Sequence, residues 1–106
     1  MAFTVELTRR ASNDLKPFRT FDQRRITDAI KEQLQHQPTE ATKNRKCLEG
    51  VEPEFDYEPP LWELRCGEFR VFYDVDQEGQ VVHVRAIRRK DQGQTTEDVL
   101  HERDDG

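Results

Sequence analysis

The alternation of apolar and polar residues in the second half of the chain constrains its fold more than any other feature. It runs through residues 61–66, is interrupted at Gly67, resumes through 69–76, and continues through 82–89 after a QEGQ loop. Successive side chains of a strand point to opposite faces of a sheet, so this period of two is typical of half-buried strands. The pattern predicts an antiparallel meander with one apolar face.

Two helices with apolar stripes precede the meander and provide the partner that its apolar face requires. Residues 3–7 alternate as a short first strand. One helix is predicted to begin after Thr8 and to end near Pro17, and another to begin at Asp22 and to end before Pro38. Apolar residues recur on them at helical spacing, at Ala11, Leu15, Phe18, Ile26, Ala29, Ile30 and Leu34. We expect an α+β fold in which an N-terminal strand and a helical hairpin pack on a twisted antiparallel sheet.

The segment 38–60 has no regular period. Cys47 and Leu48 are expected to form a short edge strand that ends at Gly50. The acidic stretch VEPEFDYEPP follows and holds three of the five prolines. Because proline lacks a backbone donor and fixes its φ angle, this stretch is predicted to be an extended loop.

A chain of 106 residues is long enough for one domain, which we expect to span 1–106. Thr95 and Asp98 can form a capping box for a short C-terminal helix over 96–102. This helix has few apolar residues, so the acidic segment 91–106 is expected to be mobile.

The net charge of −5 hides an uneven distribution. Residues 1–48 have an excess of four basic side chains and 61–90 an excess of one, whereas 49–60 and 91–106 each have an acidic excess of five. Exposed charges act mainly within a Debye length of about 8 Å, so a basic surface can persist between the acidic segments. The alternative is that all these charges only keep the protein soluble.

The chain shows no sign of export, membrane insertion or metal binding. It has no apolar run near the roughly 20 residues that span a bilayer, and its N-terminus lacks the order of a secretory signal. We therefore expect a cytoplasmic protein with no membrane partner, in which Cys47 and Cys66 are reduced thiols. The three histidines and two cysteines lack metal-ligand spacing, so no metal or other cofactor is expected.

The face of the meander turned away from the helices carries the candidate functional residues. Val82, Val84 and Ala86 are expected on the inner face of the last strand, so the outer face, predicted to be open to water, carries Arg65, Arg70, His83, Arg85, Ile87 and Arg89. Guanidinium groups bind phosphate with two hydrogen bonds and stabilise charge in phosphoryl transfer. The alternative is that each arginine pairs with an acid on a neighbouring strand.

Two further features of this face keep alternatives open. The run Arg88–Lys90 can be a phosphate clamp or a charged edge that prevents strand association. His83 can act as a general base or be an ordinary surface residue.

The segments LWELRCGEFRVFYDVD and VVHVRAIRRKDQ resemble the RelE/ParE superfamily of toxins from type II toxin–antitoxin systems. The matching motifs are Trp62–Arg65, Gly67, Phe69–Tyr73 and Val81–Lys90, with NRKCLEG as a further match upstream. The order and spacing of these motifs agree over nearly the whole chain.

The resemblance implies a toxin whose active face is covered by the tail of a cognate antitoxin. RelE-like members enter the ribosomal A site and cleave mRNA without a metal, by attack of a 2′-hydroxyl on the adjacent phosphate. ParE-like members inhibit DNA gyrase and are not enzymes in that role. A third reading is a toxin that acts only within a repressor complex with its antitoxin.

The resemblance also assigns roles to individual residues. It implies a phosphate-binding or catalytic role for Arg65, Arg70, Arg89 and Lys90. Lys46, Arg85 and Arg88 are further candidates for RNA binding. Glu63 stands where RelE has a lysine. The catalytic tyrosine of the RelE C-terminus has no counterpart, because no aromatic residue follows Tyr73 and Thr95 and Thr96 occupy that neighbourhood.

Overall fold

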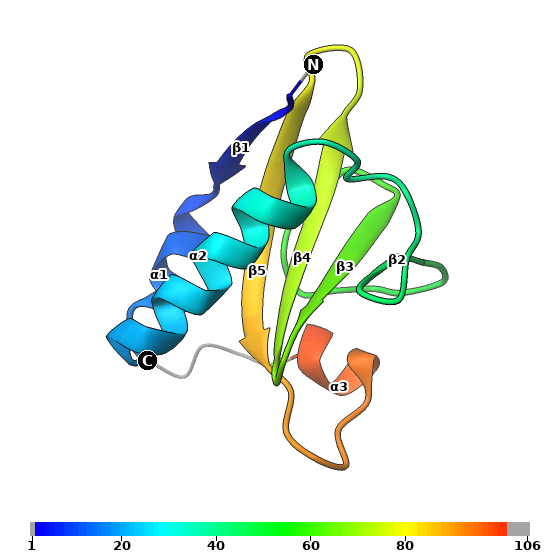
Figure 1. Cartoon of the computed structure of the whole chain (residues 1–106). Coiled ribbons are helices and arrows are strands. Elements are labelled where there is room, and N and C mark those ends of the chain that lie inside the picture. Colours follow the sequence, from blue (N-terminus) through cyan, green and yellow to red (C-terminus); the bar gives the residue numbers. More distant parts are fainter. Residues whose placement is uncertain (1, 102–106) are drawn as a thin grey trace.

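A five-stranded sheet forms the frame of the computed structural model, with the strand order β1-β5-β4-β3-β2 (Figure 1). The predicted meander is present as β3 (Leu61–Cys66), β4 (Phe69–Asp76) and β5 (Val81–Arg89). The predicted edge strand is β2 (Arg45–Leu48), antiparallel to β3. At the other edge, β1 (Thr4–Leu7) runs parallel to β5.

Three helices complete the part of the chain that the structure describes, residues 2–101. They are α1 (Arg9–Leu15), α2 (Thr20–Leu34) and α3 (Thr96–Leu100), and none is long and apolar enough to cross a membrane. The α3 helix has the expected capping box, in which the Thr95 side chain and the Asp98 side chain each accept a backbone N–H. Its predicted end at Glu102 and the rest of the acidic tail lie outside the described residues.

The apolar stripes of α1 and α2 pack on one face of the sheet, as predicted. Ile26, Ile30 and Leu34 of α2 meet Trp62, Leu64, Val71 and Tyr73 of the strands. We call this group the first cluster; its buried members are Ala11, Leu15, Ile26, Ile30, Leu34, Trp62, Leu64, Phe69, Val71, Tyr73, Val82, Val84 and Ile87. The α+β arrangement expected from the sequence is confirmed.

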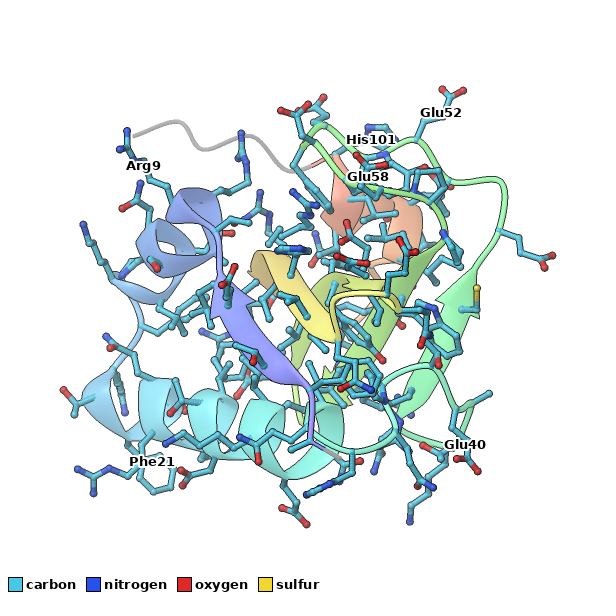
Figure 2. The ribbon with its side chains drawn as sticks, turned by 90° about the horizontal axis from the view of Figure 1, so that it is seen from above. Arg9, Phe21, Glu40, Glu52, Glu58 and His101 are labelled. Atoms are coloured by element: carbon cyan, nitrogen blue, oxygen red, sulfur yellow. The ribbon has the colours of Figure 1, made fainter. Side chains whose placement is uncertain are left out.

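The opposite face of the sheet is not open, which corrects the expectation from the sequence. A second cluster covers its middle and comprises Phe55, Leu61, Phe72, Ala86, Val99 and Leu100. The loop after β2 and the helix α3 supply its outer layer, so α2 and α3 lie on opposite sides of the sheet (Figure 2). Only the charged ends of this face remain for a ligand.

A bulge in β5 reverses the predicted faces of the residues beyond it, Ala86 to Arg89. Arg89, predicted on the outer face, pairs with Phe69 of the first cluster and therefore lies on the side of the helices, whereas Arg88 pairs with Arg70 on the outer face. Phe72 pairs with Ala86 and Tyr73 pairs with Val84, so Arg85 is an extra residue on β5. An extra residue reverses the alternation beyond it. Ala86 therefore belongs to the second cluster and Ile87 to the first, the reverse of the prediction.

A buried carboxylate fastens α1 to the sheet where β1 ends. Asp14 accepts a hydrogen bond from the backbone N–H of Ile87 at 3.0 Å and forms an ion pair with Arg88. Removing one partner of a buried ion pair costs several kcal/mol, because the other charge remains buried. This contact holds the helical hairpin in register with β5.

Replacing Ile30 with aspartate should unfold the protein or nearly so. Ile30 is 3% exposed in the first cluster, and an unpaired carboxylate there should lower the free energy of unfolding by about 3 kcal/mol or more. Urea denaturation measures this loss. Arg24→Asp places the same carboxylate on the exposed surface of α2 and should change stability by less than about 1 kcal/mol. Equal stability of the two variants would show that the wrong face of α2 has been assigned to the core.

Stability should also decrease at high pH through Tyr73. Its side chain is fully buried and its hydroxyl donates to the Pro38 carbonyl, and burial raises the pKa of Tyr73 well above its ordinary value. Above about pH 10 an unfolded tyrosine loses its proton while the folded one keeps it, so the free energy of unfolding falls as pH rises. In urea denaturation between pH 7 and 11, Tyr73→Phe should be less stable by about 1 kcal/mol at pH 7 and lack this part of the decline. Parallel pH profiles for the two proteins would contradict the assignment.

Candidate functional site

A pocket of about 140 Å³ lies at the end of the sheet beside the β3–β4 turn, on the face opposite α1 and α2. We call it the basic pocket; it is lined by Lys43, Asn44, Lys46, Glu63, Arg65, Arg70 and Lys90. Four of these residues, Lys46, Arg65, Arg70 and Lys90, were candidates from the sequence. The structure thus gathers part of the predicted set at one place.

The register of the strands places these side chains together. Lys46 of β2 lies opposite Glu63 of β3, and Arg65 of β3 lies opposite Arg70 of β4. Side chains at paired positions share a face and stand about 5 Å apart. Lys90 follows β5 and its backbone N–H donates to Glu68 in the β3–β4 turn at 2.7 Å, so the end of β5 closes the pocket.

Arg70 points away from α1 and α2, as predicted, but it is buried rather than open to water. Its side chain is 6% exposed, and one guanidinium nitrogen donates to the carbonyl oxygens of Gly67 at 2.8 Å and Phe69 at 2.9 Å. Burial lowers the pKa of Arg70 and Glu63 opposes that change. Arginine remains charged at any working pH, so Arg70 holds the turn in place and adds a fixed positive charge beneath the pocket.

Glu63 is the carboxylate among the residues that line the pocket. Its side chain is buried, with one oxygen 3.6 Å from the Lys46 ammonium and the other accepting a hydrogen bond from the Thr96 hydroxyl at 3.2 Å. The first residue of α3 therefore reaches the pocket. Glu63 neutralises part of its charge, as the sequence indicated for the acids of this face.

The pocket keeps a positive excess in spite of Glu63. Five of its lining side chains are basic and one is acidic. Within residues 2–101, Arg65, Lys43 and Lys90 have no carboxylate partner. Arg65 is exposed, so its guanidinium can form two hydrogen bonds to a phosphate without first leaving an ion pair.

The three other predicted arginines lie elsewhere and are held by acids, as the ion-pair alternative expected. Arg85 donates to both carboxylate oxygens of Asp74, at 2.7 and 3.2 Å. Arg88 is buried against Asp14. Arg89 is 58% exposed and pairs with Glu68 at 2.8 Å and Asp91 at 3.5 Å.

The histidines do not join the basic pocket. His83 lies 3.8 Å from Glu6, and His101 lies 3.3 Å from Glu97 and 3.9 Å from Glu54. In residues 2–101, no three His, Cys, Asp or Glu side chains gather as a metal-binding group. Neither thiol is in a disulfide, and burial raises the pKa of Cys66 although Arg25 and Arg70 oppose the change.

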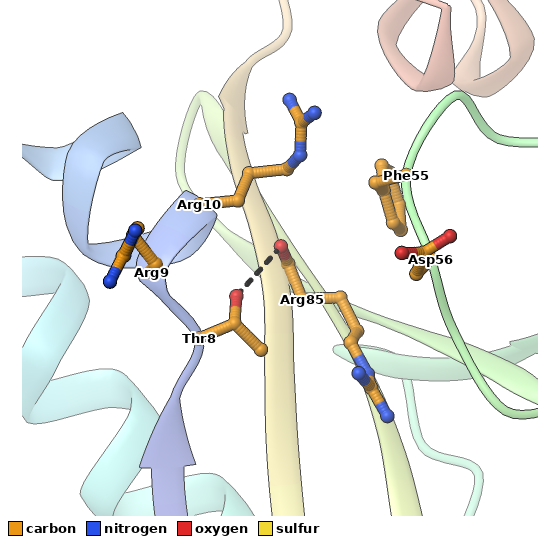
Figure 3. A pocket seen from close by; sticks show the side chains of 6 residues that line it. All are labelled: Thr8, Arg9, Arg10, Phe55, Asp56 and Arg85. Carbon is orange, nitrogen blue, oxygen red and sulfur yellow. Dashed lines mark hydrogen bonds between the residues drawn. The ribbon is translucent and has the colours of Figure 1, made fainter.

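Two other hollows carry less concentrated positive charge. One of about 260 Å³ separates the start of α1 from the loop after β2, and Arg10 extends across it toward Phe55 and Asp56 (Figure 3). Its floor is fixed by the Thr8 hydroxyl, which donates to the Arg85 carbonyl at 3.2 Å. The other, about 460 Å³, is mainly acidic and is lined by Glu58, Asp74, Val75, Asp76, Gln77, His83 and Arg85. A polyanion therefore fits the basic pocket best.

Sequence reasoning missed Lys43 and Asn44 as lining residues. They precede β2 in the irregular segment, where no period assigns a side chain to a face. The Asn44 carbonyl accepts a hydrogen bond from the Arg65 backbone at 2.7 Å and thereby brings both residues to the pocket. The clustering of bases in the motif KNRK was the available signal.

Comparison with known proteins gives one family and one fold. The family described as the ParE toxin of the type II toxin–antitoxin system, parDE, matches residues 5–93. Among curated protein sequences, none matches this chain.

Three solved structures share the fold at low sequence identity. The toxin–antitoxin complex RelBE2 from Mycobacterium tuberculosis is 20% identical, with a TM-score of 0.65 and coverage of 85% of this chain and 100% of that chain. The archaeal RelE–RelB complex from Pyrococcus horikoshii OT3 is 20% identical, with a TM-score of 0.62 and coverage of 88% and 100%. A free mutant of the E. coli toxin RelE is 23% identical, with a TM-score of 0.61 and coverage of 87% and 86%.

Arg70 and Arg65 should differ in what they contribute to stability. Arg70→Ala removes two hydrogen bonds to backbone carbonyls in the β3–β4 turn, so we expect a loss of about 1–3 kcal/mol in the free energy of unfolding. Arg65→Ala, on the paired position, removes an exposed side chain and should change stability by less than about 0.5 kcal/mol. Urea denaturation of both variants tests this, and a neutral Arg70→Ala would show that the buried guanidinium does not hold the turn.

Proposed function

This chain belongs to the ParE toxin family of type II toxin–antitoxin systems, within the RelE/ParE superfamily, and on that premise we propose that it inhibits translation by cleaving mRNA on the ribosome. The substrate would be single-stranded RNA, held by its phosphates in the basic pocket. The observation that carries the proposal is the positive excess of that pocket, with Arg65, Lys43 and Lys90 available to an anion.

The proposed reaction is transesterification at one phosphate. The 2′-oxygen attacks the adjacent phosphorus and loses its proton, the bond from phosphorus to the 5′-oxygen breaks, and the 5′-oxygen takes up a proton. Negative charge grows on the phosphoryl oxygens in the transition state, where fixed cations stabilise it most. Arg65 and Lys90 are placed to bind these oxygens, and Arg70 contributes its charge from beneath.

Proton transfer is assigned to the other lining groups. The Glu63 carboxylate can accept the proton of the 2′-hydroxyl, whereas a lysine would first have to lose its own proton. The Lys46 ammonium, 3.6 Å from Glu63, can donate to the leaving oxygen. The Thr96 hydroxyl orients Glu63 in the neighbourhood where RelE has its tyrosine.

The arginines outside the pocket have smaller parts in this proposal. Arg89 is exposed, and surface ion pairs such as its contact with Glu68 contribute little, so it can bind a flanking phosphate. Arg85 and Arg88 are held by Asp74 and Asp14, and we assign them no contact with RNA.

A cognate antitoxin is the proposed protein partner. Two of the structural relatives are complexes of a toxin with its antitoxin, which supports a similar partnership here. An acidic or extended segment of the antitoxin that covered the basic pocket would neutralise it and block access to RNA.

A second candidate function is inhibition of DNA gyrase without catalysis. The family description names ParE, and Glu63 reduces the positive charge at the position where RelE has a lysine. Under this alternative the pocket face would bind protein rather than phosphate.

Induction of the chain in cells should stop protein synthesis and leave plasmid supercoiling unchanged. Arg65→Ala should lower the rate of mRNA cleavage by about 100-fold, as expected for loss of a group that stabilises transition-state charge. Arg9→Ala, an exposed arginine outside the pocket, is the matched control and should cleave normally. Altered supercoiling with intact mRNA and continued translation would favour gyrase and contradict the nuclease proposal.

A further inference from the structure

Phe21 is the one large apolar side chain that is exposed in residues 2–101, with 70% of its surface open to solvent. It belongs to the first turn of α2 and points away from the body of the molecule (Figure 2). The neighbouring Phe18 is the aromatic residue that packs on the core here, with its ring centroid 4.9 Å from that of Phe69. The Phe21 ring therefore contributes no apolar packing to the core of the fold.

The segment that carries this ring is rich in basic residues. Residues 16–25 hold Lys16, Arg19, Arg24 and Arg25 against the single acid Asp22. The Arg25 guanidinium lies over the ring, 5.9 Å from its centroid, and 3.6 Å from the Asp22 carboxylate. An aromatic ring among basic side chains is the arrangement with which proteins bind single-stranded nucleic acid, since bases stack on the ring and phosphates meet the cations.

Arg25 connects the Phe21 corner to the β3–β4 turn, beside which the basic pocket lies. A side-chain carbon on Gly67 would stand 2.6 Å from a guanidinium nitrogen of Arg25, so Arg25 lies directly against the β3–β4 turn. The carbonyl of the same Gly67 accepts a hydrogen bond from Arg70. One turn thus separates Arg25 from the pocket-lining Arg70.

We propose that Phe21 and Arg25, with Arg19 and Arg24, form a stacking subsite for one base of a single-stranded RNA whose phosphate occupies the basic pocket. The subsite rests on the proposed function, because the pocket holds the cleaved phosphate. Its chemistry favours single strands, in which the faces of the bases are accessible, over duplexes, in which they are stacked on one another. The positive charge of the corner fits a polyanion rather than an apolar protein surface.

Binding of a labelled 12-nucleotide oligouridylate to the purified chain, followed by fluorescence anisotropy, tests the subsite. Phe21→Leu keeps an apolar side chain without the aromatic face and should weaken binding by roughly tenfold. Phe21→Trp should retain or strengthen it. Binding to a blunt RNA duplex should be unchanged in both variants, and their melting temperatures should match that of the parent protein because residue 21 is exposed.

A spectroscopic measurement reports stacking directly. The tryptophan introduced by Phe21→Trp should lose emission when the oligonucleotide binds, whereas Trp62, which is buried in the first cluster, should not respond in the parent protein. If Phe21→Leu keeps the affinity of the parent protein while Arg65→Ala binds the oligonucleotide more weakly, the subsite is overturned and the proposed function stands. If Phe21→Leu binds RNA more weakly and Arg65→Ala binds it as the parent protein does, the subsite is supported and phosphate binding by the basic pocket is contradicted. An equal loss on duplex and single strand, or no binding by the parent protein, overturns the stacking proposal.

Discussion

The bulge in β5 is the constraint on which both faces of the sheet depend. If β5 were regular through Arg85, then Ala86 and Ile87 would exchange faces, and the first cluster would contain the smaller Ala86 in place of Ile87. Beyond the bulge, Arg88 pairs with Asp14, the contact that holds α1 against the sheet. One extra residue therefore decides which side chains at the end of β5 reach each cluster, and which of its cations share the face of the basic pocket.

Much of this molecule could be predicted from its sequence, because the period of two and the helical stripes depend only on neighbouring residues. The pairing of Arg65 with Arg70 follows directly from alternation around the Gly67 turn, and with it the basic character of the pocket. The capping box at Thr95 was likewise predictable, since it needs only residues three positions apart. Local patterns thus gave the strands, the helices and the basic core of the site.

The remaining features depend on contacts between distant segments. Val99 and Leu100 are too few to predict a docked helix. Their complete burial depends on the second cluster, whose other members lie far away in the sequence, such as Phe55 and Phe72. Burial of Arg70 could not be foreseen either, because its hydrogen-bond acceptors are backbone carbonyls, which any residue type carries. The sequence placed Arg65 and Arg70 on the ligand side correctly and Arg89 wrongly, because a bulge cannot be predicted from local alternation. Which of these cations are available to a ligand depends on tertiary structure.

The two-sided burial of the sheet also separates the stages at which the chain can fold during its own synthesis. The first cluster needs no residue after Ile87, whereas the second waits for Val99 and Leu100. The second face therefore stays uncovered until α3 docks, although the helices can already close over the first. The hydrogen bond from Thr96 to Glu63 forms in the same step, so the Glu63 carboxylate of the basic pocket is fully oriented only when α3 has docked.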